Sequence, residues 1–204
     1  PTNLEELSAV TSIFRPGPLS AGVDEDYVKT KRGLKKPKYE HPILKEVLEK
    51  NYGFIIYQED LAKIAHRMGK DITLTEGNKL RKLLTKQGTG AAGSEKAKIH
   101  DKFIVGCVEK GMANSAAEKL WQKMEYFSGY GFNASHAYSY SMISFQCAWL
   151  FANYASEWVA AFLDKEPDTR KEKAIGKAKG LGFVIGELDV NYSGTVWEIS
   201  ADGK

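Results

Sequence analysis

The sequence predicts a mainly α-helical protein with one or two short extended segments and a small α/β extension at its C-terminal end. Apolar residues recur at the three- and four-residue spacing of amphipathic helices through most of the 204 residues. Many of these stretches stop at a glycine or a proline, which are common residues at helix ends. The 43% share of hydrophobic residues is enough to bury a core, so we expect a folded chain.

Composition and charge limit the classes of protein to which the chain can belong. The formal net charge of +3 does not by itself indicate a nucleic-acid partner, so the distribution of charge has to decide. Cys107 and Cys147 lie in helical patterns and are typical of reduced core thiols in a cytosolic protein. The four histidines are scattered, and no zinc-ligand spacing is present. Polar residues interrupt the most apolar stretch, 142–163, well short of a membrane span.

The first predicted helix is already under way at Pro1, and no signal-peptide pattern precedes it, as expected of a segment excised from a longer protein. Thr2 and Glu5 have the spacing of a capping box at the start of this helix. The helix is expected to stop at Arg15, because prolines follow directly. Arg15 is therefore either an anchored charge on a stiff loop or a plain helix terminator.

Two charged clusters follow. Asp24 and Asp26 have the spacing that puts two carboxylates on one face of a strand, where they can hold two Mg²⁺ ions, but their neighbours are not the apolar run of such a strand. A group of cations comes next, on a loop that contains glycine and proline. A charge run is usually solvated, but its single sign favours a polyanion partner. The cations are Lys29, Lys31, Arg32, Lys35, Lys36 and Lys38.

The middle of the chain is a series of amphipathic helices. A short apolar run at Phe54-Ile55-Ile56-Tyr57 is expected to be one buried strand or extended segment. Asn114 and Ser94 are the polar residues from which two of the helices start. The predicted helices run from His41 to Lys50, from Gln58 to Met68, from Thr75 toward a glycine-rich linker at Gln87, from Ser94 to Lys110 and from Asn114 to Phe127.

The helix from Thr75 carries a cationic face. Lys79, Lys82 and Lys86 share one side of it, and Arg81 lies about a hundred degrees from Lys82 around the same helix. Such a face is able to clamp a triphosphate or a nucleic-acid backbone. An ordinary solvated surface has the same pattern, and the residues alone leave both interpretations open.

A glycine-hinged polar loop, 130–137, precedes a long apolar run, 138–154. Ser135 is placed to cap the helix that follows. Apolar residues occupy nearly every side of this helix, so we expect it to lie inside the protein. The loop is then either a binding site on a rigid support or the capped end of a core helix.

After Pro167 the character of the sequence changes. Residues 170–179 predict a polar, basic helix, and 182–185 and 196–199 predict short strands around a turn. We therefore expect one domain at 1–166 and the start of a further region at 167–204.

Four motifs in this order carry a family resemblance. They are Phe14-Arg15-Pro16-Gly17-Pro18 (motif 1), Tyr52-Gly53-Phe54-Ile55-Ile56-Tyr57-Gln58-Glu59 (motif 2), Leu80-Arg81-Lys82 (motif 3) and Tyr130-Gly131-Phe132-Asn133-Ala134-Ser135-His136-Ala137 (motif 4). Together they resemble the fingers region of the bacterial DNA polymerase III alpha subunit, the family C replicative polymerases. Residues 180–193 are similar to the segment that follows the fingers in that family.

The resemblance implies roles for the charged and polar residues. The fingers of this family close over an incoming nucleotide, and an arginine-rich helix contributes to binding its triphosphate. Lys82 stands where a second arginine is usual, which keeps the charge and loses the bidentate fork. The implied nucleotide-binding residues are Arg81, Lys82, Lys86, Tyr130, Gly131, Phe132, Asn133, Ser135 and His136. The implied DNA-binding residues are Arg15, Lys29, Lys31, Arg32, Lys35, Lys36 and Lys38.

The same resemblance implies what the chain lacks. The three catalytic aspartates of the family belong to the palm, upstream of motif 1, so we expect no catalytic or metal-binding residue here and no activity of the chain alone. Mg²⁺ is expected in the whole polymerase, held by the palm. The expected partners are template-primer DNA, a deoxynucleoside triphosphate and the other polymerase domains, in the bacterial or host-cell cytosol or nucleoid and not at a membrane. The alternatives are a DNA-binding module without a nucleotide role and a structural remnant of a split polymerase.

Overall fold

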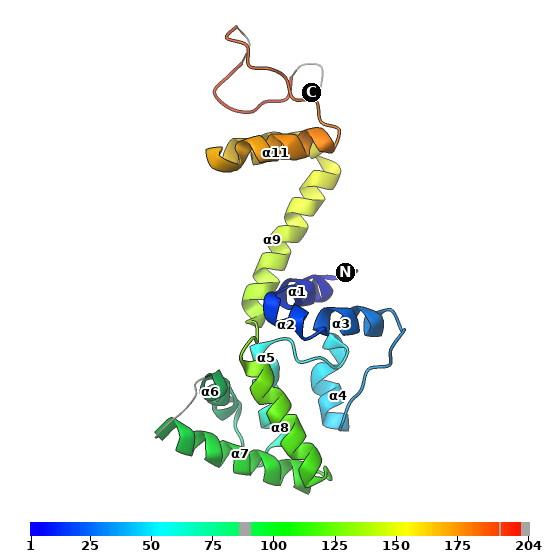
Figure 1. The fold of residues 1–204 in the computed structure, drawn as a ribbon, viewed down its shortest axis with the longest axis vertical. Coiled ribbons are helices and arrows are strands. Elements are labelled where there is room, and N and C mark those ends of the chain that lie inside the picture. Colours follow the sequence, from blue (N-terminus) through cyan, green and yellow to red (C-terminus); the bar gives the residue numbers. More distant parts are fainter. Residues whose placement is uncertain (86–90, 192, 201–204) are drawn as a thin grey trace. The chain divides into compact units, whose positions relative to one another are not determined.

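The computed structural model describes residues 1–85, 91–191 and 193–200, and every regular element in these ranges is a helix (Figure 1). This confirms the mainly α-helical prediction. The helices are α1 (Leu4–Ile13), α2 (Pro16–Ser20), α3 (Val23–Lys31), α4 (Pro42–Leu48), the short 3₁₀ helix η1 (Glu49–Asn51), α5 (Gln58–Met68), α6 (Leu74–Thr85), α7 (Ala91–Glu109), α8 (Asn114–Ser128), α9 (Ala134–Asn153), α10 (Ala155–Lys165) and α11 (Asp168–Gly180).

The chain divides into two compact units, Pro1–Ser141 and Met142–Lys204. All four motifs lie in the first unit. The predicted division at 166/167, where the character of the sequence changes, stays a prediction.

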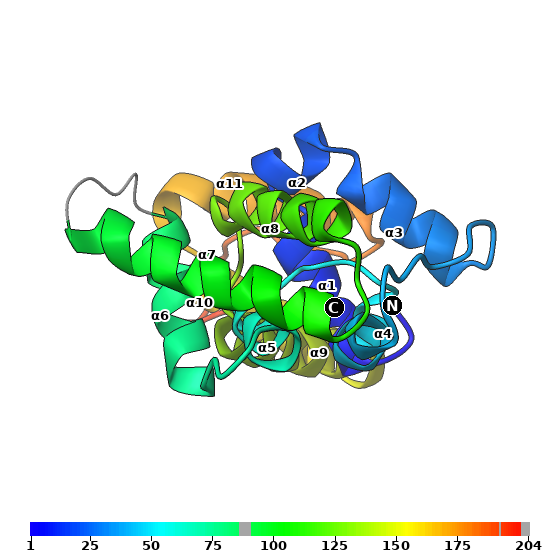
Figure 2. The ribbon, with the colours of Figure 1, turned by 90° about the horizontal axis from the view of Figure 1, so that it is seen from below.

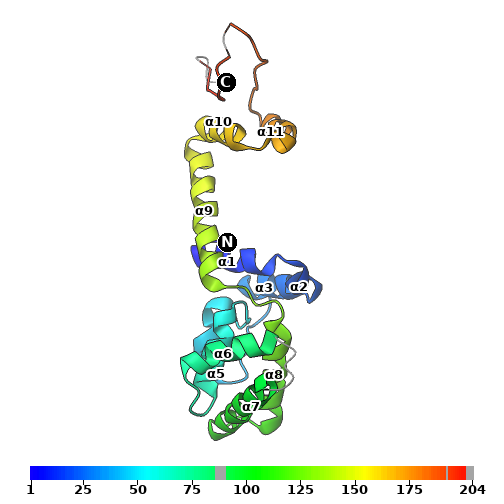
Figure 3. The same cartoon turned by 90° about the vertical axis from the view of Figure 1, so that its left-hand side faces the viewer.

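The main core of the first unit lies among helices α4 to α8. Figures 2 and 3 show α5, α6, α7 and α8 gathered together. Their inward side chains are those at helical spacing in the sequence, which is why periodicity located them. The fully buried ones include Leu61, Ile64 and Met68 of α5, Leu80 of α6, Phe103 and Cys107 of α7, and Met124 of α8.

Two glycines allow helices of this core to approach closely. A β-carbon at Gly106 of α7 would lie 2.2 Å from the backbone nitrogen of Lys70, and one at Gly77 of α6 would lie 2.6 Å from the carbonyl oxygen of Ala62. The backbone nitrogen of Lys70 also donates to the carbonyl of Lys102 over 2.9 Å. Glycine is therefore required where α6 and α7 pass the α5 region.

A buried carboxylate holds the N-terminal helices together. Glu6 of α1 accepts hydrogen bonds from the backbone nitrogen of Thr2 over 2.6 Å and from the hydroxyl of Tyr52 over 2.8 Å, and it pairs with Lys31 of α3. Burial acts to raise the pKa of Glu6, but these partners outweigh it and lower the pKa from 4.5 to about 2. Asn3 is the N-cap, with its side chain accepting from the Glu6 nitrogen over 2.8 Å. The predicted Thr2–Glu5 capping pair was thus one residue out of register.

The C-terminal part of the second unit contradicts the predicted α/β extension. Val159 and Leu163 of α10 pack against Ala174 and Ala178 of α11. No strand forms in the described residues of 181–200, although Trp197 packs against this cluster. A short apolar run needs a hydrogen-bonded partner strand to become a sheet, and these runs do not pair.

The predicted burial of α9 was also wrong. Ala137 and Ser141 are buried, but from Met142 onward the helix is mostly exposed. The exposed apolar side chains include Met142, Ile143, Phe145, Trp149 and Leu150. Apolar residues on every side of a helix predict burial, but the pattern does not say which neighbour covers them. Both cysteines are free, and Cys147 of α9 is only half-buried.

No helix in the described part of the chain is both long and apolar enough to cross a bilayer.

Replacing Gly106 with alanine tests the close approach of α7. The added methyl group collides with backbone atoms near Lys70, so we expect a loss of about 1–3 kcal/mol of unfolding free energy, as for overpacking. Gly129→Ala is the matched control, because its β-carbon would meet nothing nearer than 3.7 Å, and it should change stability by less than about 0.5 kcal/mol. Equal losses in urea denaturation would contradict this packing.

Replacing Glu6 with glutamine should lower stability at pH 7 by about 1–3 kcal/mol and flatten its acid dependence. The folded pKa lies below the unfolded one, so the unfolded chain takes up this proton first as the pH falls. The contribution of Glu6 is therefore complete above about pH 4.5 and is lost toward about pH 2. The unfolding free energy, measured by urea denaturation at several pH values, should fall between about pH 4.5 and pH 2 for the natural chain and for the exposed control Glu5→Gln. It should fall less for Glu6→Gln.

Candidate functional site

Backbone pairing joins motif 2 to motif 4. Tyr57 and Phe132 form an isolated parallel bridge. The backbone nitrogen of Gln58 donates to the carbonyl of Phe132 over 2.9 Å, and the nitrogen of Phe132 donates to the carbonyl of Ile56 over 3.4 Å. Of the two forms predicted for 54–57, a buried strand or an extended segment, the structure has the extended segment, and its partner is the loop of motif 4.

Glu59 of motif 2 anchors the start of α9. Its two carboxylate oxygens accept from the side-chain nitrogen of Asn133 over 2.8 Å and from the backbone nitrogen of Ala134 over 2.9 Å. Asn133 in turn accepts from the backbone nitrogen of His136 and from the hydroxyl of Ser135. Asn133, and not Ser135 as predicted, therefore caps this helix, because its oxygen reaches the third backbone N–H. A carboxylate beside a helix N-terminus is also favoured by the helix dipole.

Arg15 attaches motif 1 to motif 4. Its Nη1 donates to the carbonyl of Tyr130 over 3.2 Å, and its guanidinium lies 4.8 Å from the ring centroid of Phe132. Gly17 lies against Tyr130 so closely that a β-carbon there would be 3.1 Å from the tyrosine ring. Arg15 is thus an anchored charge, and the contacts described for its side chain are with Tyr130 and Phe132 of motif 4.

Arg81 attaches motif 3 to motif 2. Its Nη1 donates to the side-chain oxygen of Gln58. Its Nε is buried and has no hydrogen-bond partner among the described residues. Gly131 of motif 4 also lies against Gln58, where a β-carbon would be 2.9 Å from the glutamine Cγ. One glutamine side chain is therefore placed between the cationic helix and the loop.

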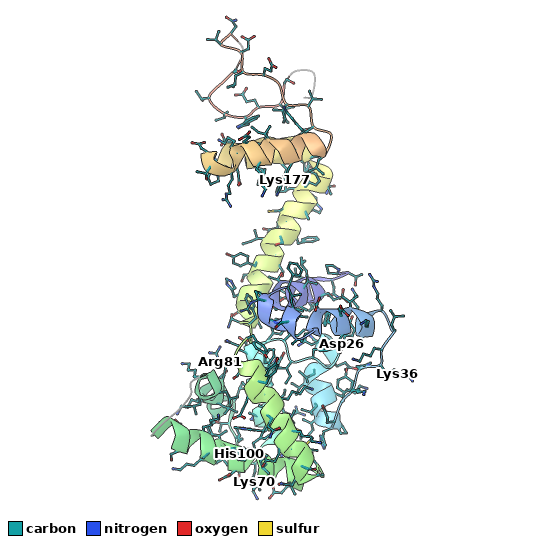
Figure 4. The ribbon with its side chains drawn as sticks, in the orientation of Figure 1. Asp26, Lys36, Lys70, Arg81, His100 and Lys177 are labelled. Carbon is teal, nitrogen blue, oxygen red and sulfur yellow. The ribbon has the colours of Figure 1, made fainter. Side chains whose placement is uncertain are left out.

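The four motifs thus meet at one place in the first unit, although they are far apart in the sequence. Figure 4 labels Arg81, which points from α6 toward this region. Ser135 and His136 remain exposed there. The His136 ring lies 5.5 Å from Phe132 and 4.6 Å from Tyr140. The place combines a fixed guanidinium, exposed polar groups and aromatic rings, which suits an anionic ligand with a flat ring.

The described contacts do not assign two of the predicted nucleotide-binding cations, Lys82 and Lys86, to the site. Lys82 is exposed on α6, and Lys86 lies outside the described residues. Sequence reasoning gave no role to Gln58 and Glu59, although both belong to motif 2. Their amide and carboxylate groups at the start of a helix, directly after a buried apolar run, were the available signal.

The predicted basic loop is only partly a free cationic surface. Lys29 and Lys31 belong to α3, not to a loop. Lys29 pairs with Glu25 over 3.0 Å, Lys31 pairs with Glu6, and Lys35 pairs with Asp26 over 2.6 Å. The side chains of the remaining cations are exposed and make no hydrogen bond or ion pair with another described residue; these cations are Arg32, Lys36 and Lys38.

Asp24 and Asp26 do not form the metal pair that their spacing allowed. They lie on helix α3, so they do not share a strand face. Asp26 accepts from Lys35, and this hydrogen bond lowers the pKa of the Asp26 carboxyl. Among the described residues no cluster of three histidine, cysteine or acidic side chains is arranged to hold a metal. The donor set does not fit a Mg²⁺ site in these ranges.

Comparisons with known proteins show the family to which the chain is similar. Residues 1–111 match a family described as the bacterial DNA polymerase III alpha subunit finger domain. The chain is 35% identical over 205 residues to the DNA polymerase III subunit alpha of Aquifex aeolicus (strain VF5), covering 100% of this chain and 17% of that protein. It is 32% identical over 212 residues to the subunit of the same name from Escherichia coli (strain K12), covering 100% of this chain and 18% of that protein. The chain therefore spans less than a fifth of these curated relatives.

Replacing Glu59 with alanine should free the start of α9. The amides of Ala134 and His136 should exchange their hydrogens faster, and stability should fall by about 1.5–3 kcal/mol, the usual size for hydrogen bonds to a charged group. Glu59→Gln keeps one acceptor and should lie between alanine and the natural residue. The exposed carboxylate variant Glu46→Ala is the control, and faster exchange at Ala134 in that variant would count against the assignment.

Proposed function

This chain belongs to the bacterial DNA polymerase III alpha subunit family, whose finger domain it matches, and we propose that it binds an incoming deoxynucleoside triphosphate and template-primer DNA during replication. The observation that carries the nucleotide part is Arg81, fixed by Gln58 beside motif 4. The polymerase that contains such a chain is, in this proposal, a DNA-directed nucleotidyltransferase.

Arg81 has the chemistry for a phosphate contact. A guanidinium offers five N–H donors in a planar fork that matches phosphate oxygens. Gln58 uses one of these donors and fixes the orientation of the side chain. The buried Nε is left without a partner in the described residues, and an unsatisfied buried donor is unfavourable. Because Nε is closed off from solvent, the proposed phosphate contact falls to the N–H groups of the fork that Gln58 does not use.

The loop of motif 4 supplies the second part of the proposed nucleotide pocket. Gly131 lets the loop approach Gln58, and Asn133 is held by Glu59, so the backbone of the loop is fixed before a ligand arrives. Ser135 and His136 stay exposed and are able to contact the nucleotide. A preorganised site loses less entropy on binding than a flexible one.

The role that we propose for these groups is positioning and charge neutralisation. In phosphoryl transfer, cations that stabilise the triphosphate act together with metal ions that activate the attacking hydroxyl. In this proposal the Mg²⁺ ions are held by carboxylates outside this chain. Phosphodiester formation by the chain alone is not expected.

The DNA part of the proposal rests on the exposed cations at 32–38. Arg32, Lys36 and Lys38 make no ion pair with another described residue, so their charges are available for phosphates. Each phosphate that they neutralise on duplex DNA would make the logarithm of the binding constant fall by about 0.9 more per tenfold increase in salt concentration. We expect a smaller share from Lys29, Lys31 and Lys35, which have acidic partners.

One observation favours a second candidate, a DNA-binding or structural module without a nucleotide role. Lys82 stands where the family resemblance leads us to expect an arginine, which weakens bidentate phosphate recognition. In that case DNA binding would be steeply salt-dependent and insensitive to Mg-nucleotide.

Replacing Arg81 with alanine in the full-length polymerase should raise the KM for the nucleotide and lower kcat/KM by about tenfold to a hundredfold. Loss of one or two charged hydrogen bonds has this size. Arg81→Lys should be intermediate, because it keeps the charge without the fork. Steady-state incorporation kinetics with varied nucleotide are the measurement.

Lys119→Ala is the control, because Lys119 is an exposed cation of α8 and lies outside the cationic face of α6. It should leave the KM close to that of the natural protein. An unchanged KM and an unchanged turnover in Arg81→Ala would contradict the nucleotide role and support the second candidate.

A further inference from the structure

A concave feature of the first unit lies away from Arg81. It is a cavity of 410 Å³, and we call it the α8 cavity because α8 forms one of its walls. The segment that joins α3 to α4 forms another wall, and the connector of motif 2 forms a third. Figure 4 shows Lys36 on the joining segment, apart from Arg81 on α6. The volume falls in the range of about 300–1,000 Å³ that is usual for small-ligand sites.

Aromatic rings line the α8 cavity. Tyr126 and Phe127 come from α8, Tyr130 follows the helix, and Tyr52 and Phe54 come from motif 2. Tyr126 and Tyr130 pack edge to face with ring centroids 5.1 Å apart. Tyr126 is nevertheless 65% exposed, so most of its ring has no protein neighbour. An exposed tyrosine at a cavity mouth offers a flat surface on which another ring can stack.

Cations border the same cavity, and they differ in how they are paired. Lys35 pairs with Asp26 over 2.6 Å, and Lys123 pairs with Glu40 over 3.4 Å. Lys36 and Lys38 line the cavity without an ion pair to another described residue. Two uncompensated charges therefore stand beside an aromatic cavity.

We propose that the α8 cavity receives one unstacked base of single-stranded DNA, while Lys36 and Lys38 hold the adjoining phosphates. Sequence-tolerant single-strand sites combine a cationic path for the backbone with aromatic rings for the bases. The α8 cavity has both parts. This inference deepens the proposed DNA binding and rests on it.

The geometry favours a single strand over a duplex. A base can enter a cavity only when it has left its stack and its pair, which is inexpensive for a single strand and unfavourable within a duplex. Lysines at the edge can contact the phosphates of either form, so they supply affinity without this discrimination. The aromatic wall is the part that distinguishes them.

The test compares two oligonucleotides of equal length, twelve-residue oligothymidylate and an abasic strand with the same phosphates. Fluorescence anisotropy at several salt concentrations measures their affinities for the 204-residue chain and for the full-length polymerase. We expect the thymidylate to bind about tenfold or more tightly than the abasic strand, the effect of one base–aromatic stack.

Variants separate the two parts of the site. Tyr126→Ala should remove the preference for thymidylate and keep the salt dependence, whereas Tyr126→Phe, which retains the ring, should keep both. Lys36→Ala combined with Lys38→Ala should lower the salt slope by about 1.4 log units, as for two phosphates of a single strand, and keep the preference. Phe14→Ala is the control, because Phe14 is an exposed ring outside the α8 cavity, and it should change neither quantity.

Three other outcomes would each contradict the base pocket, the proposed DNA binding or both. Equal, salt-dependent binding of both strands by the natural chain would overturn the base pocket and leave the proposed DNA binding intact. No binding of either strand would overturn both. A preference found in the 204-residue chain and absent from the full-length polymerase would mean that another polymerase segment fills the cavity, which overturns the inference. Arg81→Ala should leave the preference unchanged, so the nucleotide proposal is tested separately.

Discussion

The pairing of residues 56–58 with Phe132 is the constraint on which the rest of the site depends. Two backbone hydrogen bonds hold the connector of motif 2 beside the loop of motif 4. Once they form, Glu59 reaches the start of α9 and Gln58 lies between Arg81 and Gly131. A local pairing of a few residues therefore places groups from segments far apart in the sequence, and the core of α5 to α8 keeps them there.

A buried carboxylate shapes that connector. Asp60 accepts from the backbone nitrogens of Ile56 and Tyr57 over 3.1 Å and 2.9 Å, and from the side-chain nitrogen of Asn51 over 3.0 Å. Burial raises the pKa of Asp60 to about 6, and the two backbone donors act against this shift. A folded pKa above the unfolded value means that this carboxyl stabilises the fold less as the pH rises from about 4 through 6. The dependence is opposite in sign to that of Glu6.

Helix positions could be predicted from the sequence because apolar periodicity reports which faces meet a core, as Leu61 and Leu80 do. The exposure of α9 could not be predicted, because the apolar pattern does not identify which neighbour covers the helix. The α/β extension failed for a related reason, since a strand needs a partner and Val184 or Val196 cannot specify one. The residues of motifs 1 to 4 were found by their order along the chain. Their mutual contacts were not predictable, because Gln58 and Glu59 act through residues more than twenty positions away.

The two proposed binding regions share one residue, and this sharing has a physical consequence. Tyr130 lines the α8 cavity with its side chain, while its carbonyl accepts from Arg15 and its loop continues into the proposed nucleotide pocket. Gly17 packs against the same ring. A change in the rotamer of Tyr130 would therefore disturb motif 1, motif 4 and the cavity together. Tyr126 borders the cavity and meets motif 4 at the edge of the Tyr130 ring, away from the backbone contact with Arg15. A change at Tyr126 therefore disturbs DNA contact more directly than nucleotide contact.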